Sequence, residues 1–232
     1  MNAILTYDAP HRKTQDLLFR MAAAGRKDIQ VVATPWAERK NFVPIFYHRP
    51  PNNNDTPLET LCRNLGFPFI RSPHEELVSR LNDMEVEYLM IAGAGIVPGE
   101  IAENFRTVNV HPGYLPYVKG LDALKWAILE GLPIGVTSHF ISGAVDEGTL
   151  IRQERVPLYY EDSFHSLATR QYELEIKMLA EAEADIAALQ TEINLANDTY
   201  KAHRRMTHQL EVKMMDKFHE LRRNSPSHRE AE

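Results

Sequence analysis

The sequence predicts an α/β fold: a doubly wound, mostly parallel sheet followed by a helical C-terminal extension. Two observations predict it. Over residues 2–92, short apolar runs typical of buried strands alternate with helical patterns, an order that builds parallel sheets covered by helices. Between Pro157 and Pro226 there is no glycine or proline, and strong helix formers dominate. With 232 residues, 44% of them hydrophobic, the chain can bury one sizeable core.

The elements follow in order from the N-terminus. An apolar run predicts a strand over residues 2–7, and the next helix places Leu17, Leu18 and Met21 on one face. A second strand is expected over residues 29–33. The run 42–47 contains a proline, so we expect an edge strand or an extended loop there. The alternation continues with a helix starting near Thr56-Pro57, a strand at 67–70, a helix at 72–81 and a strand at 88–92.

The segment around Asn109 and His111 carries the chemistry. These two residues alternate, so on a strand their side chains leave from one face, while Val108 and Val110 point into the core. Pro112 then ends the strand, and doubly wound sheets bind ligands beyond such ends. An amide and an imidazole side by side suit acyl transfer, because they can stabilise an oxyanion and move a proton. Asp146 is the candidate carboxylate to orient the imidazole.

Two further groups are candidate binding residues. Thr137 and His139 alternate on a later strand, where Thr137 could bind an acceptor amine or a water and His139 is either packed or in direct contact. His11, Arg12 and Lys13 precede a helix start, a place that favours phosphate. A diphosphate site and a solvated basic turn both fit this cluster.

Composition limits the function classes. A net charge of −6 argues against a nucleic-acid surface, and the single cysteine, Cys62, fits a reducing compartment. The sequence has no run of about 20 apolar residues for a bilayer and no signal-peptide pattern at its start. We therefore expect a cytoplasmic protein without membrane or nucleic-acid partners. No metal site is expected.

The C-terminal part contains an apolar stripe with steps of three and four residues, from Ile176 to Ala196. A turn is expected within 194–199. Two arrangements remain open: a hairpin packed on the first domain, or a coiled coil between two subunits, in which case the protein is a homodimer. The predicted domains are a catalytic domain at 1–160, a helical extension at 161–224 and a disordered tail at 225–232.

Several blocks follow one another in a fixed order between Tyr88 and Val156. They are 91–97, 109–112, 115–116, 119–120, 135–140, 145–151 and Gln153. In order and spacing they resemble the 10-formyltetrahydrofolate-dependent formyltransferase family. The resemblance implies a Rossmann-like catalytic domain in which Asn109, His111 and Asp146 form the catalytic set.

The resemblance also implies binding residues. The cosubstrate 10-formyltetrahydrofolate is expected against a loop and a turn that comprise Ile91, Gly93, Ala94, Gly95, Ile96, Val97, Val145 and Gly148. Tyr114, which follows His-Pro-Gly, is similar to the aromatic residue of small amino-sugar formyltransferases. With Tyr114, the expected acceptor contacts are His11, Arg12, Lys13, Thr137 and His139.

These features predict an enzyme that transfers a formyl group from 10-formyltetrahydrofolate to a primary amine. The favoured acceptor is the amine of a nucleotide-linked amino sugar. Four alternatives remain: methionyl-tRNA, another small amine, hydrolysis of the formyl donor, and a non-catalytic folate-binding or assembly protein.

Overall fold

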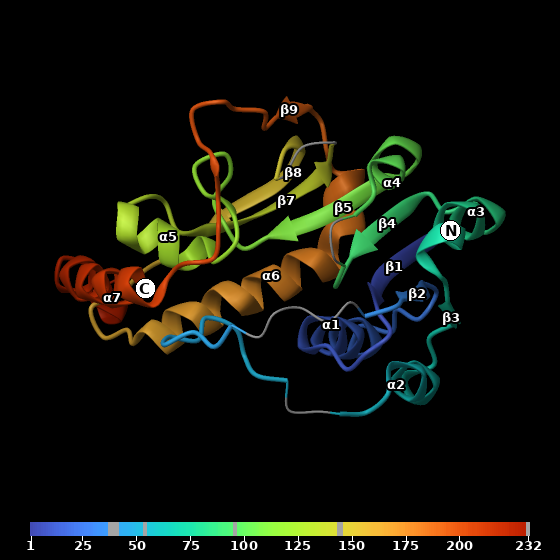
Figure 1. Cartoon of the computed structure of the whole chain (residues 1–232), viewed down its shortest axis with the longest axis horizontal. Coiled ribbons are helices and arrows are strands. Elements are labelled where there is room, and N and C mark those ends of the chain that lie inside the picture. Colours follow the sequence, from blue (N-terminus) through green and yellow to red (C-terminus); the bar gives the residue numbers. More distant parts are fainter. Residues whose placement is uncertain (37–41, 53–54, 95–96, 143–145, 231–232) are drawn as a thin grey trace.

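The computed structural model describes residues 1–36, 42–52, 55–94, 97–142 and 146–230, and it contains one large central sheet (Figure 1). The strands lie in the order β3-β2-β1-β4-β5-β7-β8-β9. Pairing is parallel from β3 to β5 and antiparallel from β5 to β9. This confirms the predicted mostly parallel sheet. The strand bounds are β1 Asn2–Tyr7, β2 Gln30–Thr34, β3 Phe69–Arg71, β4 Tyr88–Ile91, β5 Arg106–His111, β7 Gly135–Ile141, β8 Gly148–Arg155 and β9 Ile193–Asn194.

Helices cover both faces of the sheet, as a doubly wound fold requires. One face packs against α1 and α6, and the other against α3 and α4. A second, two-stranded sheet pairs β6 with β10. The bounds are α1 Arg12–Ala23, α2 Leu58–Leu65, η1 His74–Glu76, α3 Leu77–Asp83, α4 Gly99–Asn104, β6 Lys119–Gly120, α5 Ala123–Glu130, α6 Phe164–Ala187, β10 Ala202–His203, α7 His208–Arg223 and η2 His228–Glu230.

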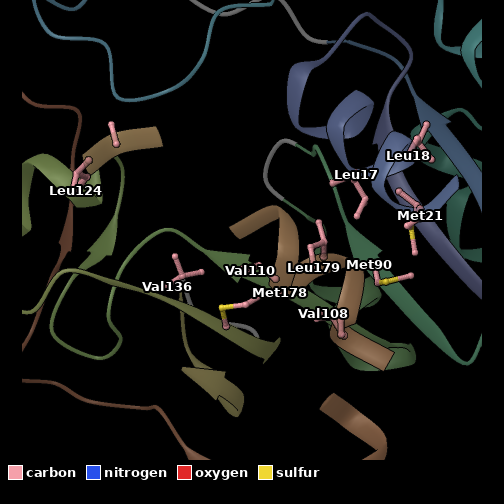
Figure 2. Close-up of a cluster of buried hydrophobic side chains, with 14 of the residues drawn as sticks. Leu17, Leu18, Met21, Met90, Val108, Val110, Leu124, Val136, Met178 and Leu179 are labelled. Atoms are coloured by element: carbon pink, nitrogen blue, oxygen red, sulfur yellow. The ribbon is translucent and has the colours of Figure 1, made fainter. Parts of the chain in front are cut away.

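The main core lies between the sheet and the α1–α6 layer, where apolar side chains from both interlock (Figure 2). Val108 and Val110 of β5 are buried in it beside Met178 and Leu179 of α6. The alternation along β5 therefore turns Asn109 and His111 toward the opposite face. The period-two pattern that predicted their placement is confirmed.

The apolar stripe of the C-terminal part is helical only as far as Ala187, and Ile193 lies in the short strand β9. The prediction of a helical stripe to Ala196 was therefore wrong. Ile176, Leu179, Ala182 and Ile186 are buried in the main core. Because these four face this chain's own sheet, they are not available for a coiled coil between subunits.

The remaining C-terminal residues pack on the chain in an unexpected way. After α6 the chain crosses to β6, and α7 then lies against α5 (Figure 1). Phe218 of α7 is buried, and Lys125 of α5 forms a fully buried ion pair with Glu211. The tail expected to be disordered makes hydrogen bonds, since the His228 backbone N–H donates to Glu161.

Two smaller findings complete the fold. The described residues 42–48 of the run around Pro44 form no strand, so the loop alternative applies. Among the residues the structure describes, no helix is long and apolar enough to cross a membrane.

Candidate active site

The candidate site lies where β5 ends, beside the antiparallel strand β7. In this pairing Asn109 stands opposite His139, and His111 stands opposite Thr137. Asp146 approaches from the turn before β8, and its Oδ1 lies 3.3 Å from His111 Nδ1. The structure thus brings together the three residues predicted as the catalytic set.

Both ring nitrogens of His111 face oxygen atoms. Nε2 lies 2.9 Å from the carbonyl oxygen of Val118, and Nδ1 faces Asp146. A neutral imidazole can donate only one hydrogen bond, whereas the imidazolium form can donate both. The loop after His111 must approach the ring closely, because a Cβ at Gly113 would lie only 2.6 Å from Nε2. Glycine is therefore required at this position.

Asp146 is held from two sides. Its Oδ2 accepts a hydrogen bond of 2.6 Å from the backbone N–H of Gly120, while Oδ1 faces His111. The residue has a φ of +50°, in the left-handed region that aspartate tolerates better than most side chains. The carboxylate is therefore oriented before any ligand binds.

His139 orients the amide of Asn109. Its Nδ1 lies 3.2 Å from the carbonyl oxygen of Glu147, so Nδ1 carries the proton. Burial, followed by the proximity of His111, lowers the pKa of His139 from 6.5 to about 4, so the ring is neutral near pH 7. Nε2 is then an acceptor, and it faces Asn109 Nδ2 at 3.4 Å. One N–H of the amide is engaged here and the second can serve a ligand.

Thr137 supports the loop after His111 and has no capacity left for a substrate. Its hydroxyl donates to the Gly113 carbonyl, and it accepts from the Leu115 N–H and from the Gln153 amide, at 2.8 to 3.0 Å. One donor and two acceptor positions are all a hydroxyl has. These contacts favour a supporting role for Thr137 over the expected contact with the amine.

Gln153 completes this support and was not predicted as a site residue. Its amide also donates to the Leu115 carbonyl, at 2.6 Å. Gln153 stands directly opposite Thr137 in the β7–β8 pairing. The register of that pair is the signal that could have identified it.

The basic cluster at the start of α1, in which His11 precedes the helix and Arg12 and Lys13 are its first residues, does not present free cations. Lys13 Nζ lies 2.9 Å from Glu175 of α6, a fully buried carboxylate that also pairs with Arg49. Burial disfavours the charged form of Glu175, but Arg49 and Lys13 outweigh it and lower its pKa to about 2. Arg12 is engaged by Asp16 at 2.7 Å. Because Arg12 and Lys13 are both paired with carboxylates of the chain, the cluster does not support a diphosphate site.

His11 packs inward instead. Its ring meets Tyr7 edge-on, and Nδ1 lies 3.0 Å from the Thr14 hydroxyl. A Cβ at Gly93 would lie 2.7 Å from that ring. The small residue at Gly93 thus makes room for His11.

The other residues expected near the folate lie in part at the same sheet edge. Ile91 is the last residue of β4. Ala94 and Val97 are partly buried against the apolar cluster between the sheet and the helices α3 and α4. Gly148 begins β8 with a φ of +123°, and a Cβ there would meet the Phe140 carbonyl oxygen at 1.9 Å, so only glycine fits. The predicted contacts at Gly95, Ile96 and Val145 lie outside the described residues.

Comparison with known proteins agrees with this fold. A likely sugar N-formyltransferase from Mycobacterium tuberculosis has a similar structure, with a TM-score of 0.62 at 19% identity, over 93% of this chain and 86% of that one. WlaRD, a sugar 3N-formyl transferase studied in the presence of dTDP and 5-N-formyl-THF, gives 0.58 at 14% identity, over 98% and 82% of the two chains. Both structures place the chain in the Rossmann-like class.

The family model described as formyl transferase matches residues 51–182, more than half of the chain. The chain therefore belongs to the formyl transferase family. The match includes Asn109, His111 and Asp146, but it excludes His11 to Lys13 and everything beyond most of α6.

Curated relatives match shorter stretches. The trifunctional purine biosynthetic protein adenosine-3 of Gallus gallus is 34% identical over 110 residues, 45% of this chain and 11% of that protein. The dTDP-4-amino-4,6-dideoxyglucose formyltransferase of Mycobacterium tuberculosis is 33% identical over 84 residues, 36% of each chain. The matches thus cover little more than a third of these relatives at most.

Proposed function

We propose that this protein transfers a formyl group from 10-formyltetrahydrofolate to the primary amine of a nucleotide-linked amino sugar. The observation that carries the proposal is the 3.3 Å approach of Asp146 to His111, beside Asn109, at the end of β5. A buried imidazole with a carboxylate on one side and an amide donor on the other suits a reaction that develops negative charge on a carbonyl oxygen.

In the proposed reaction the amine nitrogen bonds to the formyl carbon, and the bond from that carbon to the folate nitrogen breaks. Negative charge develops on the formyl oxygen in between. The second N–H of Asn109 donates to this oxygen, since the first is held by His139. The proton that the amine loses passes to the folate nitrogen as tetrahydrofolate leaves.

The engagement of His111 defines how it acts. Because Nε2 faces the Val118 carbonyl and Nδ1 faces Asp146, neither ring nitrogen of His111 is left to donate to the oxyanion directly. Asn109 is then the direct donor. Asp146 keeps the ring in place.

The folate supplies the formyl carbon, and we place its flat ring at the edge beside Asn109. Met90 pairs with Val108, so Ile91 lies level with Asn109 on the neighbouring strand, about 5 Å away. The residues at 92–94 are small. The N–H groups of Ala92 and Gly93 both donate to the Leu5 carbonyl, so these two groups are not available to the heterocycle.

The acceptor class rests on the relatives. One curated relative is named as the formyltransferase of a dTDP-linked amino sugar, and two structural neighbours are described as sugar formyltransferases. The net charge of −6 disfavours a tRNA acceptor. A cytoplasmic location and a homodimer also stay proposals. The coiled coil no longer supports a homodimer, because its apolar residues are buried within the chain. Light scattering would test the oligomeric state.

The test uses purified protein with 10-formyltetrahydrofolate and dTDP-4-amino-4,6-dideoxyglucose. We expect a formylated sugar by mass spectrometry together with an equal amount of tetrahydrofolate. Reactions without sugar separate transfer from hydrolysis, and the His111→Ala variant controls for a contaminating enzyme. Tetrahydrofolate release that does not require any amine would contradict the proposal in favour of a hydrolase.

A further inference from the structure

A cavity lies beside the loop that contacts the candidate site. It measures about 260 Å³ and lies between the loop before β6, the end of α5 and the segment that contains β10. Its lining residues are Tyr117, Glu130, Thr199, Tyr200, Lys201, Ala202 and His203. Residues 199–203 lie beyond the family match at 51–182, so this wall belongs to the chain's own C-terminal part.

Tyrosine rings form one wall of the cavity. Tyr117 and Tyr200 lie with ring centroids 5.1 Å apart and planes at 59°, and Tyr114 follows at 6.2 Å from Tyr117. Because Tyr117 and Tyr200 are tilted, neither covers the face of the other completely. Such half-exposed rings offer stacking surfaces for a flat heterocycle.

Polar residues also line the cavity. Glu130 lies 3.4 Å from His203, which in turn stacks on Trp126 at 4.4 Å. The carboxylate can accept from a base N–H or a sugar hydroxyl. Lys201 is exposed, and within the described residues it has no ion pair with any carboxylate of the chain. A cation in this position suits a phosphate.

The loop that lines the cavity also contacts the candidate site. β10 pairs with β6, and Gly120 of β6 donates its N–H to Asp146. Tyr117 is followed by Val118, whose carbonyl contacts His111. One short loop therefore carries both a wall of the cavity and two contacts of the catalytic set.

We propose that this cavity binds the nucleoside diphosphate part of the acceptor, with the base against Tyr117 and Tyr200 and a phosphate at Lys201. The inference rests on the proposed function, because it assigns the acceptor its docking site. It replaces the basic cluster at the start of α1, where Arg12 and Lys13 are engaged within the chain.

The test measures binding rather than turnover. Calorimetry gives the Kd of dTDP and of thymidine for the full chain and for variants. Removing one aromatic partner of a base should raise both constants about five- to 150-fold in Tyr200→Ala, while Tyr200→Phe keeps them. Lys201→Gln should raise the Kd of dTDP about two- to fivefold and leave that of thymidine unchanged. Tyr160→Ala, which removes an exposed ring elsewhere, is the matched control.

The outcomes separate this proposal from the proposed reaction. Loss of binding in Tyr200→Ala at an unchanged melting temperature supports the cavity, even if no formyl transfer is found. No binding of dTDP by the wild type overturns it, as does equal binding by wild type and Tyr200→Ala, and formyl transfer then remains to be judged by its own assay. If Tyr200→Ala weakens a folate analogue and not dTDP, the cavity belongs to the folate and the proposal is wrong.

Discussion

The neutral state of His139 makes the protein sensitive to mild acid. Burial lowers the pKa of this histidine from 6.5 to about 4. Between these values the unfolded chain binds a proton that the folded chain does not, so stability falls as the pH falls. The contribution is fully present above pH 6.5 and is lost as the pH falls toward 4.

The magnitude follows from the two pKa values. At pH 5 the pH lies 1.5 units below the pKa of the histidine in the unfolded chain. At about 1.4 kcal/mol per unit, the free energy of unfolding is therefore about 2 kcal/mol lower than at pH 7. His48 acts in the same direction, since burial and nearby cations lower its pKa to about 3. The wild type alone therefore cannot isolate the contribution of His139, and a variant is needed.

His139→Gln provides that comparison, because a glutamine can still donate to the Glu147 carbonyl and accept from Asn109. Urea unfolding at pH 7, 6 and 5 should show the wild type losing about 2 kcal/mol more than this variant. His165→Gln, which removes an exposed histidine of α6, is the matched control. Equal losses in wild type and His139→Gln, or an NMR titration of His139 centred near 6.5, would refute the assignment of a buried neutral ring that orients Asn109.

Three further predictions follow from the site and its support. His111→Ala and Asp146→Ala should each lower kcat about a hundredfold or more while folate binding persists, and the double variant should be little worse than the worse single one; near-normal turnover in either contradicts their pairing. Lys13→Met should lower the free energy of unfolding in urea by about 3 kcal/mol, because it leaves the buried Glu175 with one cation. The Michaelis constant for the acceptor should stay unchanged, and Lys13→Arg should recover most of the lost stability. A raised Michaelis constant without a loss of stability would instead support a phosphate contact at Lys13. Thr137→Val should lower the free energy of unfolding by about 2 kcal/mol or more, because the buried groups that bond to the hydroxyl are left without a partner. Thr137→Ser should stay near wild type. A Val variant that is stable but less active would favour a contact between Thr137 and the substrate.

The sequence predicted those parts of the molecule that local patterns determine. Alternation along β5 placed Asn109 and His111 on one face, because strand geometry alone decides this. The pairing of Lys13 with Glu175 joins residues far apart in the chain, so no local pattern reports it. The saturation of Thr137 likewise depends on the register of β8, which the pattern of either strand alone does not specify.

The C-terminal part shows the same limit. Helix-forming residues continue past Ala187, and intrinsic propensity therefore predicted a longer helix than α6. Pairing of β9 with β8 and of β10 with β6 overrides that propensity in the segment between α6 and α7. These long-range pairs also create the cavity wall, which is why the sequence pattern did not indicate it.

The buried contact of Glu211 constrains how the chain is made. This carboxylate meets Lys125, 86 positions earlier, and the backbone N–H of Ile45, 166 positions earlier. At a synthesis rate of about 5–20 residues per second, Ile45 waits about 8 to 33 s for its partner to emerge from the ribosome. Lys125 is made later and waits about 4 to 17 s, during which its ammonium faces an incomplete layer and stays hydrated. Closure of the layer around α5 is thus a late event in biogenesis, and it follows the synthesis of residues 199–203, which line the cavity beside β10.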